Sequence, residues 1–240
     1  MNLTAEITVS ISAIGPIKDN FDEPRIKIGQ AKRHIHRLEV MQDDHFMTDW
    51  YSYEFSPSSK GKRAELSVVA QLPGNEFGAV MDDIIHNCRA SLDILACLLV
   101  RLNDETDNKV NFPFSNSAQE LDSMITHKNF NRASNASVDT LKKLKPYKGG
   151  NLILRAIHDL DIYDKHRALI PAAGNITTPE VKAEVIDGET FITHVVESKP
   201  KMRLIFPENG PLGKQEIIPA LKECIRHTEE IIKMFEEMNT

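Results

Sequence analysis

Ionisable side chains interrupt the apolar face of a predicted helix at residues 152–169, and they are the first candidates for chemistry in this chain. At about 100° per residue, Asp164 falls in the middle of the apolar side, and Asp161 and Arg167 fall at its two edges. A carboxylate that faces a protein core is costly unless it is paired and hydrogen-bonded. The helix therefore needs a charged partner from elsewhere in the chain.

A second predicted helix, at residues 76–102, offers that partner. Its core stripe consists of Ile85, Cys88, Leu92, Leu95 and Leu99. A polar stripe runs beside it at spacings of four, three and four residues, and consists of Asp82, His86, Arg89 and Asp93. Side chains at these spacings are neighbours on one helix face. We expect the 152–169 helix to cover this polar stripe.

The contact between the two helices is predicted to be a charged network. Arginine binds carboxylates bidentately, and we therefore expect Arg89 to bind Asp161 or Asp164. Asp93 is expected to pair with Lys165 or Arg167 of the second helix. Besides Arg89 and Asp93, the predicted network contains Asp82, Asp161, Asp164, Lys165 and Arg167. It has two interpretations, a buried scaffold that fixes the helices in register or a catalytic or ligand-binding cleft.

The elements around these helices indicate one α+β domain over residues 1–240, with a mainly helical bundle as its core. Residues 1–24 would form a strand and its connection, 25–170 the helical core, and 171–240 a β-meander and a long final helix. Helices are expected at 25–41, 76–102, 117–130, 136–144, 152–169 and 215–238. Alternating apolar residues predict a strand at 5–11, a hairpin over 51–70 and a three-stranded antiparallel meander over 181–206.

Composition is typical of a globular protein, with 41% hydrophobic and 27% charged residues among 240. A net charge of −6 argues against general coating of nucleic acid. The three cysteines, Cys88, Cys97 and Cys224, lie in apolar helical segments and are predicted to be reduced thiols. The longest apolar stretch, 94–100, is too short to cross a bilayer. We predict a cytoplasmic protein without a membrane partner, a cofactor or a metal site.

Four segments together resemble an uncharacterised family of bacterial and phage proteins. Met81–Asp93 is similar to the family's H-N-x-R-x-x-L-D signature, and Asp164–Arg167 is similar to its D-K-H-R signature. Asn111–Phe114 and Lys145–Tyr147 fit the family in the same order. The resemblance covers residues 25–170. It implies a polar signature of His86, Asn87, Arg89, Asp93, Asp164, Lys165, His166 and Arg167. The family has no assigned activity, and its spread is compatible with a role in phage–host conflict or in toxin–antitoxin regulation.

A binding or regulatory protein with a structural Arg/Asp network is the leading functional prediction. The final helix, 215–238, carries a continuous apolar stripe that could serve a protein partner or a homodimer. The alternative is a metal-independent ribonuclease of the HEPN type, in which an arginine holds phosphate and a histidine transfers protons. Arg89 would act with His86 or His166, assisted by Asp93.

RNA would then contact a basic segment of the chain. Its candidate residues are Lys142, Lys143, Lys145 and Lys148. A solvated surface is the simpler interpretation of this segment. A metal-dependent hydrolase built on His158 and Asp159 is disfavoured, because helical phase turns Asp159 and His166 away from the face that holds Asp161 and Asp164.

Overall fold

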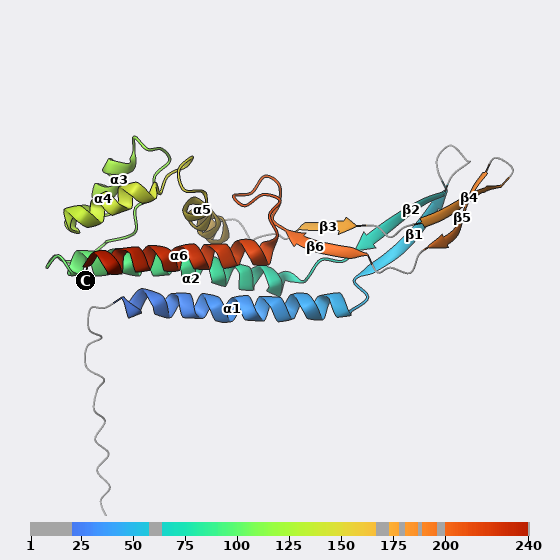
Figure 1. Cartoon of the computed structure of the whole chain (residues 1–240), viewed down its shortest axis with the longest axis horizontal. Helices are drawn as coiled ribbons and strands as arrows, with labels where there is room; N and C mark the ends of the chain where they lie inside the picture. The colour runs from blue at the N-terminus through green and yellow to red at the C-terminus, as the bar shows by residue number, and fades with distance from the viewer. Residues whose placement is uncertain are drawn as a thin grey trace, which may run out of the picture.

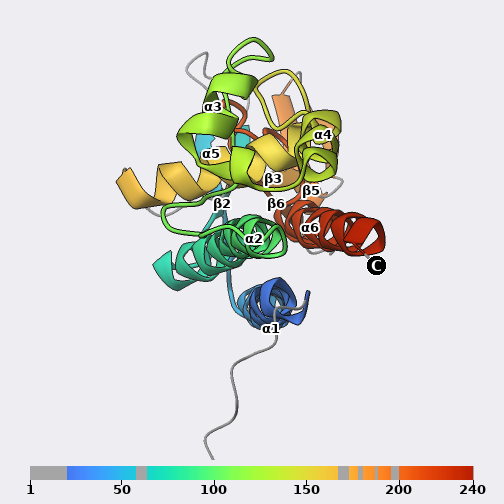
Figure 2. The same cartoon turned by 90° about the vertical axis from the view of Figure 1, so that its left-hand side faces the viewer.

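Three long helices form the body of the molecule. The computed structural model describes residues 21–57, 64–166, 173–177, 181–186, 189–195 and 200–239. Helix α1 (Asp22–Met47) packs on α2 (Asn75–Arg101) and α6 (Ile217–Asn239), and these two also pack on each other. Figures 1 and 2 show α1 as the outer layer and the α2–α6 pair as the middle layer.

Shorter helices form the third layer, on the side of α2 and α6 that faces away from α1 (Figure 2). They are α3 (Leu121–His127), the 3-10 turn η1 (Phe130–Arg132), α4 (Asn135–Leu144) and α5 (Leu152–His166). Of these, α5 contacts both α2 and α6. The layer therefore places α5 against the α2 face that carries the polar stripe.

Burial around each helix follows from its layer. Helix α1 buries a single stripe, Ile28, Ala31, Ile35 and Leu38, because only one of its faces meets other helices. Helix α2 is buried on most of its circumference, since it lies between α1 and α5. The predicted core stripe of α2 is confirmed. It consists of Ile85, Cys88, Leu92, Leu95 and Leu99, each at most 1% exposed.

The apolar stripe of α6 packs within the chain. Its buried members include Leu221, Cys224, Ile225, Thr228, Ile231, Ile232 and Phe235. Helix α6 packs on α1, α2 and α5, and its end also contacts Thr140 of α4 through Met238. This stripe is therefore filled by the chain's own core, and the interpretation of it as a surface for a partner or a homodimer is wrong.

Antiparallel strand pairs form an arm that projects from one end of the helical body (Figure 1). Strand β1 (Tyr51–Pro57) pairs with β2 (Ala64–Ala70), with Tyr51 opposite Ala70. Strand β4 (Val181–Ile186) pairs with β5 (Glu189–Val195), as the Asp-Gly turn predicts. The pairing of β1 with β2 confirms the predicted hairpin over 51–70.

The third strand of the predicted meander pairs differently. Strand β6 (Lys201–Ile205) lies antiparallel to β3 (Ala173–Thr177), with Gly174 opposite Leu204, and does not extend the β4–β5 pair. The chain reaches β6 through Pro200, which has no N–H to donate to a neighbouring strand. Met202 and Leu204 of β6 are buried, which fixes this strand to the body. The expectation of a three-stranded meander over 181–206 is therefore wrong, because the third strand pairs with β3 and not with β5.

Helix positions agree with the sequence prediction to within a few residues for α2, α4 and α6. Helix α1 extends six residues beyond its predicted end at 41. Helix α3 is shorter than 117–130, because Asn129 adopts a left-handed conformation with φ of 57° and ends the helical path. The predicted strand at 5–11 lies outside the described residues. No helix in the described part of the chain is long and apolar enough to span a membrane.

Candidate functional site

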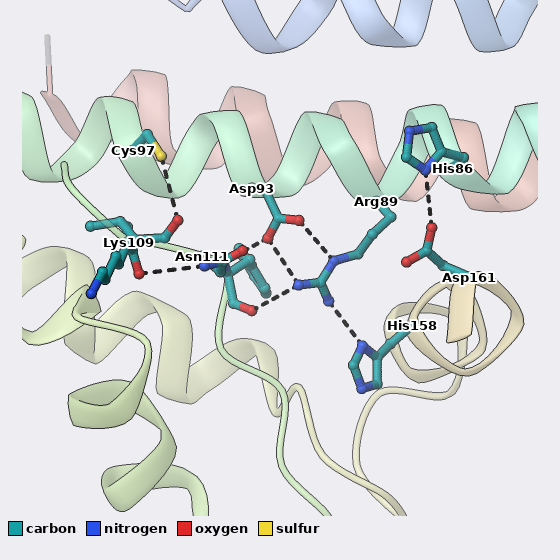
Figure 3. A network of polar contacts seen from close by, with 10 residues as sticks. His86, Arg89, Asp93, Cys97, Lys109, Asn111, His158 and Asp161 are labelled. Carbon is teal, nitrogen blue, oxygen red and sulfur yellow. Dashed lines mark hydrogen bonds and ion pairs between the residues drawn. The ribbon is translucent and has the colours of Figure 1, made fainter. Parts of the chain in front are cut away.

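The polar stripe of α2 meets α5 and the loop that follows α2 (Figure 3). Arg89 and Asp93 are one helical turn apart on α2, and His158 and Asp161 come from α5. The loop contributes Phe112 and Phe114. Asp93 accepts a hydrogen bond from the Phe112 N–H at 2.8 Å, which fixes the loop to the helix. Three segments distant in sequence thus converge on one arginine.

Hydrogen bonds occupy all three nitrogens of the Arg89 guanidinium. Nε donates to Asp93 Oδ2 at 3.1 Å, and Nη2 donates to Asp93 Oδ1 at 2.9 Å. Nη2 also approaches the Phe112 carbonyl at 3.3 Å, and Nη1 lies 2.9 Å from His158 Nδ1. The Arg89 side chain is only 10% exposed. This cation is paired and almost closed to solvent.

Aromatic contacts complete the enclosure of Arg89. Its guanidinium carbon lies 4.4 Å from the centroid of the Phe114 ring. The His158 ring stacks on Phe114 with centroids 4.5 Å apart and planes 5° from parallel. A cation over an aromatic face is stabilised by the ring quadrupole. Phe114 therefore holds both Arg89 and its histidine partner.

His158 is held as a neutral ring. Arginine can only donate, so Nδ1 of His158 is the acceptor and the ring proton lies on Nε2. Burial lowers the pKa of His158 to about 3, with further lowering by the positive charges of Arg89 and Arg155. Such an imidazole is a fixed hydrogen-bond partner and not a base near neutral pH.

His86 has the opposite character. Its side chain is 51% exposed, and its Nδ1 lies 3.2 Å from Oδ1 of the buried Asp161. Within the described part of the chain, its Nε2 has no hydrogen-bond partner. A carboxylate that orients one ring nitrogen leaves the other able to exchange protons with a bound molecule. This is the residue of the site best placed for acid–base chemistry.

The predicted convergence of the two helices is confirmed for His86, Arg89, Asp93 and Asp161. The predicted pairing of Arg89 with Asp161 is wrong. Arg89 binds Asp93 of its own helix, because residues four apart are adjacent on a helix and need no second element. Asp82 is buried on the same helix. The side chains of Asp164, Lys165 and His166, and the whole of Arg167, lie outside the described residues.

Sequence reasoning considered His158 only as a metal ligand, and it did not predict that His158, Phe112 and Phe114 contact Arg89. His158 lies three residues before Asp161 and therefore shares its face of α5, a signal that was available in the spacing. The phenylalanines belong to a loop without periodicity, and no pattern within that loop predicts which face of α2 it covers. Their role follows only from tertiary contacts.

The four candidate RNA-binding lysines belong to another part of the third layer. All of them are exposed, on α4 and the turn that follows it. Lys142 pairs with Asp122 at 2.7 Å. Lys145 ends α4 in a left-handed conformation. Whether they contact RNA stays a prediction.

Metal-ligand types do not gather in the described part of the chain, where no three histidine, cysteine, aspartate or glutamate residues could hold one ion together. The cysteines Cys88 and Cys224 are buried, and Cys97 is half-buried with its thiol 3.6 Å from the Val110 carbonyl. Burial raises the pKa of all three thiols, that of Cys88 to about 12. These thiols are therefore unsuited to nucleophilic catalysis at neutral pH.

Comparison with protein-family models, curated proteins and solved structures found no match for this chain. The resemblance to the bacterial and phage family therefore stays a prediction.

Proposed function

We propose that this chain is a binding or regulatory protein in which the Arg89 network is a scaffold between α2, α5 and the 102–120 loop. The observation that carries this proposal is the closure of Arg89. Its three nitrogens bind Asp93, His158 and the Phe112 carbonyl, and its face is covered by Phe114. An arginine that must hold a substrate phosphate needs donors directed at the substrate. Here they are directed at the protein.

The projecting β arm supports a binding role. Strands β1 and β2 form a two-stranded ribbon at the end of the body (Figure 1). Val69 on β2 and Leu72 just after it are more than 40% exposed. Two-stranded ribbons are marginally stable alone and gain from additional contacts. An arm of this form extends the surface that the chain can present to a partner. A role in phage–host conflict follows only from the family resemblance and stays a prediction.

A metal-independent ribonuclease is the second candidate function, and the exposed His86 beside the buried Asp161 is the observation that favours it. In this proposal, His86 Nε2 would accept the proton of a ribose 2′-hydroxyl, and Asp161 would orient the imidazole. Arg89 would need to exchange one of its protein partners for a phosphate. That exchange is the step that the observed geometry opposes.

One experiment separates the two functions. The full chain is incubated with fluorescently labelled single-stranded RNA in the presence of EDTA, beside the His86→Ala variant. The scaffold proposal predicts equal and background-level cleavage by both proteins. Cleavage that falls at least about tenfold in His86→Ala, with an unchanged melting temperature, would establish the ribonuclease. His36→Ala is the matched control, because His36 is another exposed histidine on a helix of the body.

A further inference from the structure

After its acidic first turn, which contains Asp22 and Glu23, helix α1 is divided by charge along its length. Residues 25–37 contain five Lys or Arg residues and no acidic residue. Residues 38–47 contain three acidic residues and no Lys or Arg. The two sets are Arg25, Lys27, Lys32, Arg33 and Arg37 in the first half, and Glu39, Asp43 and Asp44 in the second. A helix with this pattern is electrostatically complementary to a reversed copy of itself.

The outer face of α1 also exposes apolar side chains in a line. Figures 1 and 2 show α2 and α6 on one side of α1 only. On the opposite face, Ile26, Val40 and Met47 are 58%, 45% and 87% exposed. With Arg33 they repeat every seven residues, at 26, 33, 40 and 47. A seven-residue repeat is the spacing at which one helix packs along another.

Four charges beside this line are unpaired among the residues that the structure describes. No described residue forms an ion pair with the exposed Arg33, Arg37, Asp43 or Asp44. Charges on the flank toward α6 are paired with that helix. Arg25 binds Glu236, Lys32 binds Glu229, and Glu39 binds Lys222. In the described part of the chain, Arg33, Arg37, Asp43 and Asp44 are therefore available to a second molecule.

We propose that a second copy of this chain docks on the outer face of α1, with the two α1 helices antiparallel about a two-fold axis near Val40. In this arrangement Arg33 and Arg37 of each copy face Asp43 and Asp44 of the other. Both sets of pairs form at once, as an isologous interface requires. A parallel arrangement would place like charges together. A nucleic acid laid along α1 would meet Asp43 and Asp44, so the charge division favours a second copy over a polyanion.

A groove beside the acidic half has room for the incoming side chains. It has a volume of about 500 Å³ and lies between α1, β6 and the start of α6. Val40, Asp43 and Glu216 are among its lining residues. An arginine of the second copy can place its aliphatic stem along Val40 and its guanidinium near Asp43. A contact limited to one helix pair is smaller than the roughly 1,600 Å² of a standard interface. We therefore expect a reversible dimer that dissociates at high salt.

Sedimentation velocity of the full chain over a concentration series tests the dimer. The expected result is a monomer–dimer equilibrium whose dissociation constant rises about tenfold or more between about 50 mM and about 500 mM NaCl, because exposed charges are screened. A monomer at every concentration in low salt overturns the proposal.

Charge-reversal variants locate the interface. The acidic variant carries Arg33→Glu and Arg37→Glu, and the basic variant carries Asp43→Lys and Asp44→Lys. Each alone should dimerise at least about tenfold more weakly than the unmodified chain. An equimolar mixture of the two should form a heterodimer, because every α1–α1 pair is then between opposite charges. Lys143→Glu with Lys148→Glu is the matched control, since it makes the same charge change on another surface and should leave the dimer intact.

Two further outcomes overturn the proposal. If both charge-reversal variants dimerise as tightly as the unmodified chain, the dimer interface lies elsewhere on the molecule. Binding of labelled RNA that the acidic variant loses, together with the absence of a heterodimer in the mixture, would make α1 a polyanion surface. Melting temperatures of both variants should match that of the unmodified chain, because all four side chains are exposed.

Discussion

Replacing Arg89 by alanine is the perturbation that tests the scaffold most directly. The substitution removes both hydrogen bonds to Asp93, the donor to His158 and the contact with Phe114. Breaking a buried ion pair costs about 3–5 kcal/mol. Asp93 is 29% exposed and still accepts the hydrogen bond from the Phe112 N–H in the variant. Loss of its ion pair with Arg89 should therefore cost less, about 2 kcal/mol of unfolding free energy.

The remaining contacts add to this value. A lost donor to a neutral acceptor costs about 1 kcal/mol, and the cation–π contact contributes about 0.5–1 kcal/mol. We therefore expect Arg89→Ala to lower the free energy of unfolding by about 3–4 kcal/mol. For a chain of 240 residues, a denaturant slope of about 3 kcal/mol/M places the urea midpoint about 1 M lower.

Urea titration followed by circular dichroism measures this shift. The matched control is Arg226→Ala on α6, because Arg226 also pairs with glutamates three and four residues away but is exposed. Its midpoint should not move measurably, since exposed pairs contribute little. Arg89→Lys keeps the charge but cannot reproduce the planar contacts, and should recover less than half of the loss. A midpoint for Arg89→Ala equal to that of Arg226→Ala would refute the scaffold.

Two other properties follow from the same structure. His158 has a folded-state pKa of about 3, below its unfolded value near 6.5, so the unfolded state binds more protons between these limits. The free energy of unfolding should therefore fall as pH drops from 6.5 toward 3, by at most about 1.4 kcal/mol per pH unit, and this loss should be smaller in His158→Gln. An unchanged slope in that variant contradicts the assignment. For the thiols, Cys97 should react first and slowly with a disulfide reagent at pH 8, and Cys88 and Cys224 only in denaturant. The folded Cys97→Ser variant retains only the buried Cys88 and Cys224, so its rapid labelling would contradict this order.

Periodicity predicted the positions of α2, α4 and α6 to within a few residues, and it predicted the faces that α2 and α6 bury. The apolar stripes of α2 and α6 follow from residue spacing alone, because the 3.6-residue turn fixes which side chains share a face. The same spacing placed Arg89 and Asp93 together on α2, and it directed Asp161 of α5 toward that helix. The pairing of β4 with β5 was equally local, because an Asp-Gly pair between two alternating segments predicts a hairpin.

Tertiary structure decided which partner each group chose. The rotation and crossing of α5 against α2 brought His158 to Arg89 and Asp161 to His86, although spacing along each helix allowed other pairings. The 102–120 loop supplied Phe112 and Phe114 without any periodic signal. Strand β6 paired with β3 across an intervening hairpin. The sequence of an element determines the positions of side chains around its own axis. Distances between elements depend on how the whole core packs, and no single segment contains that information.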